Sequence, residues 1–344
     1  MTKPRHVSVL RDEAVQALAP ERGGVFIDAT FGAGGYAVAL LQNGASQVLG
    51  IDRDPSAVNE AEAAISSSNG RLQVVQGNFS DLEELAIANA AHPVDGIAFD
   101  FGVSSMQLDR AQRGFSLRLD GPLDMRMSQS GSSATDFLNT ATEHEIAIVI
   151  RRLGEEPRAK HIARAIIEVR KTVRLTRTIQ LAELVLKAIG RRPDARIHPA
   201  TRTFQAIRMH VNDELGQIES GLRAAERALK PGGRLAVVSF HSLEDRLVKQ
   251  FLRVRSGLIP SASRYDPSAL SKSLRSPSFR LLSRRPTVPG ESELSTNPRA
   301  RSAKLRTAER LDTPVFSDRE LGVLGLSATQ PFFGSPLGPS SLAV

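Results

Sequence analysis

Short apolar runs alternate with helical patterns over the first hundred residues, and this alternation constrains the fold more than any other feature. The runs with the composition of buried strands are residues 24–29, 47–51, 72–75 and 96–99. Helical patterns lie between them, at residues 35–41, about 55–65 and about 81–88. Strands that alternate with helices pair in parallel through crossover connections. The sequence therefore predicts an α/β fold built on a parallel sheet.

This alternation of strand and helix patterns ends after Asp100. Residues 104–140 are polar, glycine-rich and irregular, whereas residues 143–190 carry apolar positions at helical spacing with no strand pattern between them. The second stretch predicts three helices, and thus an all-helical insertion. Beyond it the pattern predicts a long amphipathic helix, a tight turn, a buried strand and a further helix, at about residues 203–229, 230–233, 234–240 and 243–254.

These patterns divide the chain into four segments. We predict a first part of the sheet domain, an inserted helical substrate-recognition domain, a second part of the sheet domain and a disordered tail, at residues 1–103, 104–202, 203–315 and 316–344. The second part of the sheet domain includes a stretch rich in Ser, Pro and Arg at about residues 258–300, which predicts a long mobile basic loop.

The composition excludes several classes of protein. Cysteine is absent, which rules out disulfides and cysteine-ligated metal sites, and the spacing of the histidines predicts no metal site. No apolar run is long enough to span a membrane, and the first residues lack the apolar stretch of a signal peptide. We therefore expect no membrane partner and a cytoplasmic location.

The distribution of charge indicates a polyanionic partner. Residues 1–150 carry 10 basic and 19 acidic side chains, a net charge of −9. Residues 151–210 carry 15 basic and 5 acidic side chains, and residues 271–310 carry 10 and 3, net charges of +10 and +7. An acidic body followed by two basic segments favours a catalytic domain with a separate surface for nucleic acid, although a basic helix can also be a merely solvated face.

A glycine-rich turn follows the first predicted strand, at residues 28–35 (DATFGAGG). Glycines let the backbone approach a ligand closely, and the amides at the start of the next helix point toward it. The spacing of Gly32, Gly34 and Ala37 also satisfies the dinucleotide pattern G-x-G-x-x-A. The turn alone is therefore compatible with a nicotinamide enzyme as well as with a methyltransferase.

Residues at the ends of the other strands help to distinguish a nicotinamide enzyme from a methyltransferase. Asp52 ends the second strand, where a carboxylate accepts the hydroxyls of a ribose, and Phe79 follows the third strand, where a ring can stack on adenine. Asp100 ends the fourth strand, beside the point where ligands of such sheets bind. The turn LKPGGRL at residues 229–235 is typical of methyltransferases, so the set favours S-adenosylmethionine over NAD.

Nine segments together resemble the bacterial 16S rRNA cytosine-N4 methyltransferase family. They are SVL at 8–10, TFG at 30–32, IDRD at 51–54, DFGVSS at 100–105, RGFS at 113–116, GPLDMRM at 121–127, TRTFQA at 201–206, SFHSLEDR at 239–246 and NPRARS at 297–302. The chain departs from the family where Tyr36 stands in place of a frequent His and Phe101 in place of the usual Leu.

The resemblance implies a class I, Rossmann-like S-adenosylmethionine methyltransferase sheet with an inserted all-helical domain. It implies N4-methylation of a cytosine in the decoding region of 16S rRNA, within the small ribosomal subunit. Carried over by position, the family's cofactor contacts fall on Gly34, Gly35, Tyr36, Asp52, Phe79, Asp100 and Gln107. The contact at Tyr36 is expected from the backbone, which would tolerate the change of side chain.

The expected chemistry needs an acceptor near the exocyclic amine, because the N4 lone pair is delocalised into the ring. Asp100 is the first candidate, but it fits a role as a pure cofactor ligand at least as well, and neighbouring carbonyl groups are an alternative acceptor. The Asn/Asp-Pro-Pro-Tyr/Phe motif of amino-methylating DNA enzymes is absent. His241 follows a predicted strand, and a structural role suits it better than a catalytic one.

An RNA base inside a folded molecule must be extruded to reach the methyl group. Phe115, Phe204 and Phe240 are candidates for stacking on it, although isolated Phe residues are more often core. Nine basic side chains of the predicted insertion are expected to hold phosphates: Arg151, Arg152, Arg158, Lys160, Arg164, Arg170, Lys171, Arg174 and Arg177.

Three alternatives to this function remain open. The first is a methyltransferase that acts on DNA or protein, and the second is a non-catalytic RNA-binding protein that retains a nucleotide-binding fold. A nicotinamide oxidoreductase is the third. Labelling of mixed substrates, cofactor turnover and titration with NADH distinguish them from an rRNA methyltransferase.

Overall fold

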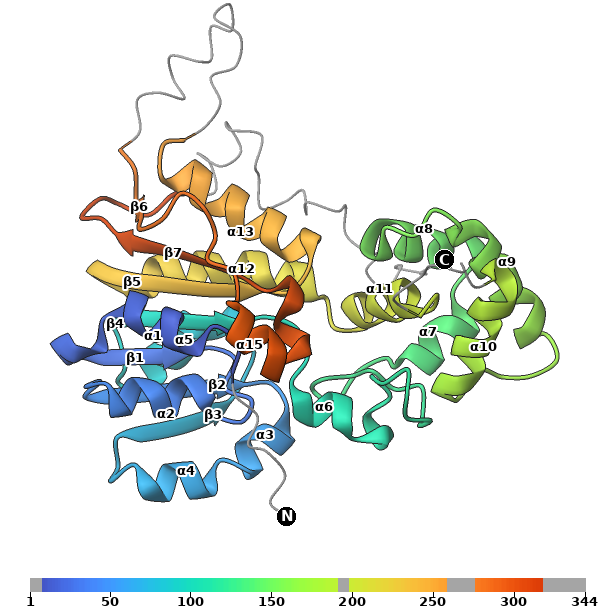
Figure 1. Ribbon diagram of the computed structural model, residues 1–344, viewed down its shortest axis with the longest axis horizontal. Helices are drawn as coiled ribbons and strands as arrows, with labels where there is room; N and C mark the ends of the chain where they lie inside the picture. Colours follow the sequence, from blue (N-terminus) through green and yellow to red (C-terminus); the bar gives the residue numbers. More distant parts are fainter. Residues whose placement is uncertain (1–7, 191–197, 259–275, 318–344) are drawn as a thin grey trace, which may run out of the picture. The chain divides into compact units, whose positions relative to one another are not determined.

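The computed structural model describes residues 8–190, 198–258 and 276–317, which form two compact units (Figure 1). The sheet unit holds the described residues up to Gly102 and those from Leu215 onward. The helical unit holds the described residues of Val103–Glu214.

The sheet unit is built on a seven-stranded sheet with the strand order β3-β2-β1-β4-β5-β7-β6 within the described residues. Strands β1 to β5 are parallel, and β7 runs antiparallel to both β5 and β6. The strand bounds are Val25–Asp28, Gln47–Asp52, Leu72–Gln76, Val94–Asp100, Leu229–Ser239, Phe279–Leu281 and Lys304–Arg310. The predicted parallel α/β sheet is thereby confirmed.

Helices cover the sheet and close its core. Their bounds are α1 Arg11–Leu18, α2 Gly35–Gln42, α3 Pro55–Asn59, α4 Glu62–Ser67, α5 Leu82–Ala88, α12 Glu214–Ala228, α13 Ser242–Arg255 and α15 Glu291–Thr296. Leu18 of α1 and Leu40 of α2 pack with Phe26 and Ala98 of the sheet in one buried cluster, and Leu294 of α15 lies against it. Burial of these apolar faces supplies the main stabilisation of the unit.

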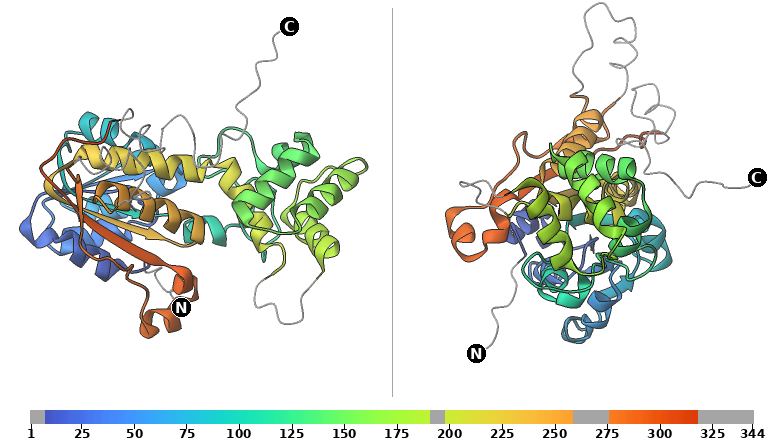
Figure 2. Two further views of the ribbon diagram at one scale, coloured as in Figure 1. Left: turned by 90° about the horizontal axis from the view of Figure 1, so that it is seen from above. Right: turned by 90° about the vertical axis from the view of Figure 1, so that its right-hand side faces the viewer.

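The helical unit surrounds a second buried cluster (Figure 2, left). Its helices are α6 Ser105–Asp109, α7 Ala134–Thr140, α8 Glu143–Gly154, α9 Ala159–Arg170, α10 Thr178–Ile189 and α11 Thr201–Val211. Ile150 of α8, Ile166 of α9 and Val185 of α10 are fully buried in this cluster. The three helices expected within residues 143–190 are therefore present, and so is the inserted all-helical part of the predicted fold.

The prediction of one long helix at residues 203–229 is wrong, because this stretch forms two separate helices, α11 and α12. Asp213 adopts a left-handed backbone with φ of 45°, which ends α11. The side chain of Asn212 donates a hydrogen bond to the carbonyl of Met125 and accepts one from the N–H of Met127. Arg208 forms a bidentate ion pair with Glu214 across the break, at 2.7 Å. These contacts hold a break that the apolar periodicity does not reveal.

Smaller differences concern loops and turns. The stretch expected to be irregular at residues 104–140 contains α6 and α7, each started by a side-chain capping box. The expected tight turn at residues 230–233 lies inside β5, where the pairing with β4 shifts register. The helix expected at residues 55–65 is divided into α3 and α4. Side-chain capping accounts for α6 and α7 and a register shift for the turn within β5, and neither changes the apolar pattern.

The predicted basic loop at residues 258–300 is partly structured, because β6 and α15 lie within it. Residues 259–275 of that loop lie outside the described residues, and so does the predicted tail from residue 318 onward. Among the described residues, no helix combines the length and apolar character needed to cross a membrane.

Candidate cofactor and RNA sites

Three aspartates end neighbouring strands of the sheet unit: Asp28 on β1, Asp52 on β2 and Asp100 on β4. Because these strands are parallel, their carboxyl ends meet at one edge of the sheet, where α/β proteins bind ligands. We call this region the carboxyl edge.

The glycine turn after β1 is held against the carboxyl edge by Phe31. The N–H of Phe31 donates to the carbonyl of Ile51 at 2.9 Å, and the N–H of Gly34 donates to the carbonyl of Phe31 at 2.7 Å. A Cβ atom at Gly34 or at Gly50 would lie 2.7 or 2.5 Å from the Phe31 ring. These two glycines therefore allow the ring to pack beneath the turn.

Asp52 ties the turn to the second strand. Its carboxylate accepts hydrogen bonds from the N–H of Gly32 at 2.7 Å and the N–H of Asp54 at 2.8 Å, one on each oxygen. Burial raises the pKa of Asp52 above its ordinary value, and the two N–H donors partly offset this effect. A carboxylate oxygen accepts more than one hydrogen bond, so each oxygen retains capacity for a ribose hydroxyl.

Asp28 is a buried titratable group whose behaviour the sequence analysis did not anticipate. It is fully buried and accepts hydrogen bonds from the N–H groups of Ala37 at 3.0 Å and Thr30 at 3.4 Å. Loss of hydration raises its pKa to about 7, and the charge of Asp52 adds to the rise. Its position at the end of a buried strand, directly before the turn, is the sequence signal for this burial.

Asp100 ends β4 with one carboxylate oxygen that has no hydrogen-bond donor among the described residues. Its N–H donates to Thr30 Oγ1 at 2.7 Å, but its Oδ1 is buried and has no hydrogen-bond partner among the described residues. Burial raises its pKa well above the ordinary value, with the charges of Asp28, Glu244 and Glu293 adding to the rise. A buried acceptor without a donor is costly, and a donating or cationic ligand would relieve that cost.

Phe79 belongs to a group of three aromatic rings at the ends of β3 and β4. Its ring centroid lies 5.6 Å from that of Phe99 and 5.7 Å from that of Phe101. Phe79 is half-buried, whereas its two partners are buried. A Cβ at Gly221 of α12 would lie 2.6 Å from the Phe79 ring, so the helix packs closely on it. The Phe79 ring is thus held rigidly beside the carboxyl edge.

The other predicted cofactor residues lie at two helix starts. Gly34 and Gly35 begin α2 with Tyr36, whose side chain is 2% exposed and whose hydroxyl donates to the carbonyl of Val9. The Tyr36 side chain is therefore part of the core, and a cofactor contact through its backbone stays a prediction. Gln107 lies in the helical unit, where it is 5% exposed and forms the capping box of α6 with Ser104.

His241 begins α13. Its Nδ1 accepts the N–H of Glu244 at 3.4 Å, and Glu244 Oε2 accepts the N–H of Phe240 at 2.7 Å. Glu244 is fully buried, and its other oxygen lies 3.0 Å from His241 Nε2. The imidazole thus caps a helix. Phe240 is half-buried beside Gly102, whereas the two other stacking candidates, Phe115 and Phe204, are buried in the core of the helical unit.

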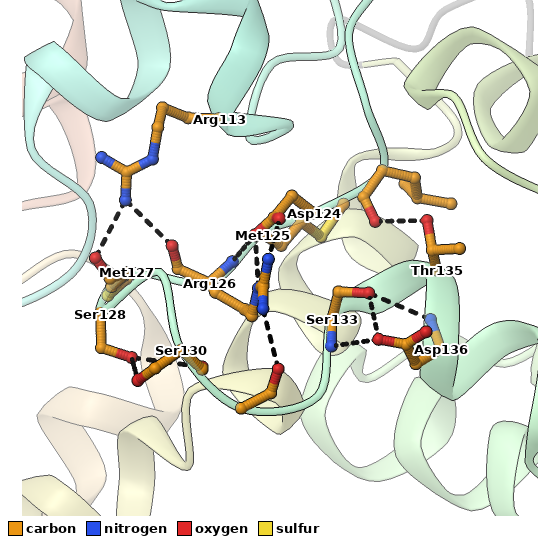
Figure 3. Close-up of polar contacts among 12 residues, drawn as sticks. Arg113, Asp124, Met125, Arg126, Met127, Ser128, Ser130, Ser133, Thr135 and Asp136 are labelled. Carbon is orange, nitrogen blue, oxygen red and sulfur yellow. Dashed lines mark hydrogen bonds and ion pairs between the residues drawn. The ribbon is translucent and has the colours of Figure 1, made fainter.

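The GPLDMRM segment forms a rigid loop in the helical unit (Figure 3). The Arg126 guanidinium binds the Asp124 carboxylate at 2.6 Å and the carbonyl of Gly131 at 2.9 Å. Arg113 donates to the carbonyls of Arg126 and Met127, both at 2.9 Å. The polar residues of this segment therefore fold the loop upon itself.

The nine basic residues predicted to bind phosphates lie on helices α8 and α9 and on the segments that follow each of them. Eight of them are exposed, and Arg170 is half-buried. Arg170 donates to the carbonyls of Leu138 at 2.8 Å and Ala141 at 2.7 Å, which gives it a structural role. Arg152 and Lys160 have no side-chain partner among the described residues, and therefore remain available to a ligand.

Comparison with known proteins decides the family. Residues 3–311 match the model of the MraW methylase family. The chain belongs to this family. A Rhizorhabdus wittichii relative named ribosomal RNA small subunit methyltransferase H is 55% identical over 309 residues, which cover 90% of this chain and 94% of the relative. A protein of the same name from Methylobacterium nodulans is 52% identical over 314 residues, 91% of this chain and 92% of the relative.

Solved structures are more distant from this MraW-family chain. A putative methyltransferase from Streptococcus mutans, solved in complex with SAH, is 11% identical and has a TM-score of 0.40. The match covers 89% of this chain and all of that one. An rRNA methylase from Streptococcus thermophilus is 10% identical with a TM-score of 0.38, and the match covers 88% of this chain and 94% of that one.

Proposed function

We infer that this MraW-family protein is an S-adenosylmethionine-dependent methyltransferase that acts on N4 of a cytosine in 16S rRNA. Relatives named as small subunit rRNA methyltransferases match it over nine tenths of both chains. The structural observation that carries the proposal is the buried Asp100 oxygen, which has no donor among the described residues, at the same sheet edge as Asp52. Together they suit a ligand with both a donor group and a ribose.

The residues of the carboxyl edge fit the parts of the cofactor. Asp52 would accept hydrogen bonds from the ribose hydroxyls, the Phe79 ring would contact the adenine, and Asp100 would accept from a donating or cationic group. The amides that begin α2 would approach through Gly34, Gly35 and the backbone of Tyr36. Gln107 lies in the helical unit, and its contact with the cofactor stays a prediction from the resemblance. The cofactor, when bound, supplies a methyl group made labile by its attachment to a sulfonium.

N4 of the cytosine would accept the methyl group that the bound cofactor supplies. N4 then carries one proton too many, which an acceptor must remove. Asp100 is the first candidate on this chain, because its raised pKa makes it a stronger base than an ordinary carboxylate. Its role as a cofactor ligand accounts for the same geometry, and a variant that separates the two roles is described in the Discussion.

The helical unit is proposed to recognise the RNA. The exposed cations of α8, α9 and the segments after them would hold phosphates and position the strand, while the target base is extruded from its stack. Because the relatives are named for the small ribosomal subunit, we propose that the substrate is 16S rRNA within that subunit, modified in the cytoplasm.

The decisive experiment supplies methyl-labelled S-adenosylmethionine and small ribosomal subunits from a strain that lacks the gene. The rRNA is digested, and the labelled nucleoside is identified by mass spectrometry. Label in N4-methylcytidine supports the proposal, and Asp52→Ala is expected to abolish it. Label in DNA or protein offered to the same reaction, with none in rRNA, would assign a different substrate. Cofactor binding without transfer to any acceptor would favour a non-catalytic RNA-binding protein.

A further inference from the structure

The sheet unit has an open hollow of about 520 Å³ between α13, the segment after β6, and β7. Ser242 begins α13 at the end of the sheet where β5 finishes, whereas Arg253, which lines the hollow, lies near the other end of the helix. At about 1.5 Å per residue, Arg253 is roughly 16 Å along the helix axis from Ser242. The hollow is therefore separate from the carboxyl edge.

Four cations line this hollow: Lys249, Arg253, Arg284 and Arg306. No acidic side chain is among its described lining residues. Arg306 is neutralised by Asp245, which accepts its hydrogen bonds at 2.7 and 3.2 Å. Lys249, Arg253 and Arg284 have no side-chain hydrogen bond or ion pair among the described residues, so their charges are uncompensated within this part of the chain.

The placement of these cations is unfavourable for the stability of the protein without a ligand. Lys249 and Arg253 are four residues apart on α13, a spacing at which like charges destabilise a helix. Arg253 has one compensation, because it lies in the last turn of α13, where the helix dipole favours a cation. Lys249 follows Asp245 by four residues, a favourable spacing for an ion pair, but the Asp245 carboxylate binds Lys304 and Arg306 instead. Arg284 lies outside the helix and has no compensation of this kind. An anionic ligand in the hollow would neutralise Lys249 and Arg284 and so explain their placement.

The hollow also has an apolar floor. Leu252, Leu258 and Leu281 line it, and Leu258 is 43% exposed. Apolar surface beside uncompensated cations lowers the local dielectric constant and strengthens attraction to an anion. The leucines suit a ligand with flat, weakly polar faces, and the cations suit one with repeated negative charges. An RNA strand combines both properties.

We propose that this hollow binds the sugar–phosphate backbone of the RNA substrate, at a second site apart from the helical unit and from the carboxyl edge. Phosphate groups contact Lys249 and Arg284, and a ribose or base face lies on the leucines. The proposal rests on the proposed function, which makes RNA the polyanion that the protein meets. Two separated backbone contacts would fix the register of a folded RNA before its target base is extruded.

The test compares two double variants of the full chain. Lys249→Gln with Arg284→Gln removes the two cations that have no structural compensation. Arg22→Gln with Lys230→Gln removes two exposed cations elsewhere in the same unit, of which Lys230 is paired with Asp95, and is the control. Affinity for a small-subunit rRNA fragment is measured over a series of salt concentrations, and S-adenosylmethionine affinity is measured by calorimetry.

The hollow variant is expected to bind the RNA about tenfold more weakly than the control variant, with the slope of log affinity against log salt reduced by about two. Cofactor affinity is expected to be unchanged in both variants. Equal RNA affinities and equal slopes would overturn the proposal, as would a change confined to binding of inorganic phosphate. Absence of methyl transfer by the wild-type protein would instead refute the proposed function, which this binding comparison does not measure.

Discussion

Glu293 accepts a hydrogen bond at 2.9 Å from the backbone N–H of Leu10, 283 residues earlier in the chain. Leu10 is fully buried and adopts a left-handed backbone with φ of 50°, which is unfavourable for a residue with a side chain. The carboxylate of α15 thus holds the strained start of α1, close to Val9, which accepts the hydrogen bond of Tyr36.

Replacement of Glu293 by Ala is expected to lower the free energy of unfolding by about 1 to 2 kcal/mol, because a buried N–H loses a charged acceptor. Glu293→Gln retains an oxygen at the same place and should lose less. Urea denaturation of both variants measures the difference. An alanine variant as stable as the wild type would show that the contact does not hold the start of α1.

Asp28 is expected to give folding a specific pH dependence. Its folded pKa of about 7 lies above the ordinary value of an aspartate, 3.8, so the folded state holds the proton more tightly. The contribution of this group is most favourable below about pH 4, declines as the pH rises toward 7 and is constant above, a total loss of roughly 4 kcal/mol.

Urea denaturation between pH 4 and pH 8 tests this expectation. Asp28→Asn should lose less stability than the wild type as the pH rises from 4 to 7, and the exposed Asp12→Asn provides a charge-matched control. Parallel stability curves for the wild type and Asp28→Asn would contradict the raised pKa.

Asp100→Asn separates the two roles proposed for this residue. If the carboxylate is a cofactor ligand, the variant should bind S-adenosylmethionine at least about tenfold more weakly, with no loss of thermal stability, because a buried charge without a donor has been removed. Calorimetry and thermal melting measure the two effects, with the exposed Asp81→Asn as control. Normal cofactor affinity with lost methyl transfer would instead assign Asp100 as the proton acceptor.

Gly50→Ala is expected to destabilise the turn at the proposed cofactor site. The added Cβ would lie 2.5 Å from the Phe31 ring, so the ring must move and the free energy of unfolding should fall by about 1 to 3 kcal/mol. Gly290→Ala is the control, because its Cβ would meet nothing within 4 Å. Chemical denaturation and cofactor affinity are measured together. A Gly50→Ala variant unchanged in both would show that the ring is free to shift.

Some cations of the helical unit are expected to bind RNA, whereas Arg170 is expected to stabilise the fold. Arg152→Gln with Lys160→Gln should weaken rRNA binding about tenfold and reduce the salt slope by about two, without loss of stability. Arg170→Gln should instead lower the free energy of unfolding by about 1 to 3 kcal/mol, because two carbonyls lose a charged donor. Filter binding measures RNA affinity, and urea denaturation measures stability. Lost stability in the double variant with weakened RNA binding by Arg170→Gln would exchange the two assignments.

The parallel sheet and the three helices within residues 143–190 were predictable from the sequence for a physical reason, whereas the family followed from the resemblance of nine motifs. Buried strands require continuous apolar runs and helices require apolar residues at helical spacing, and both patterns are local. The aspartates that end β1, β2 and β4 were recognisable for the same reason, since each directly follows such a run.

Only the tertiary structure decided what these local patterns leave open. The break at Asp213 depends on hydrogen bonds of Asn212 to Met125 and Met127, far away in the sequence. Whether the Asp100 oxygen finds a donor among the described residues depends on how distant segments pack, and a pKa depends on the burial that packing creates. Apolar periodicity is a property of one segment, whereas hydration, charge and hydrogen-bond partners belong to the whole folded unit.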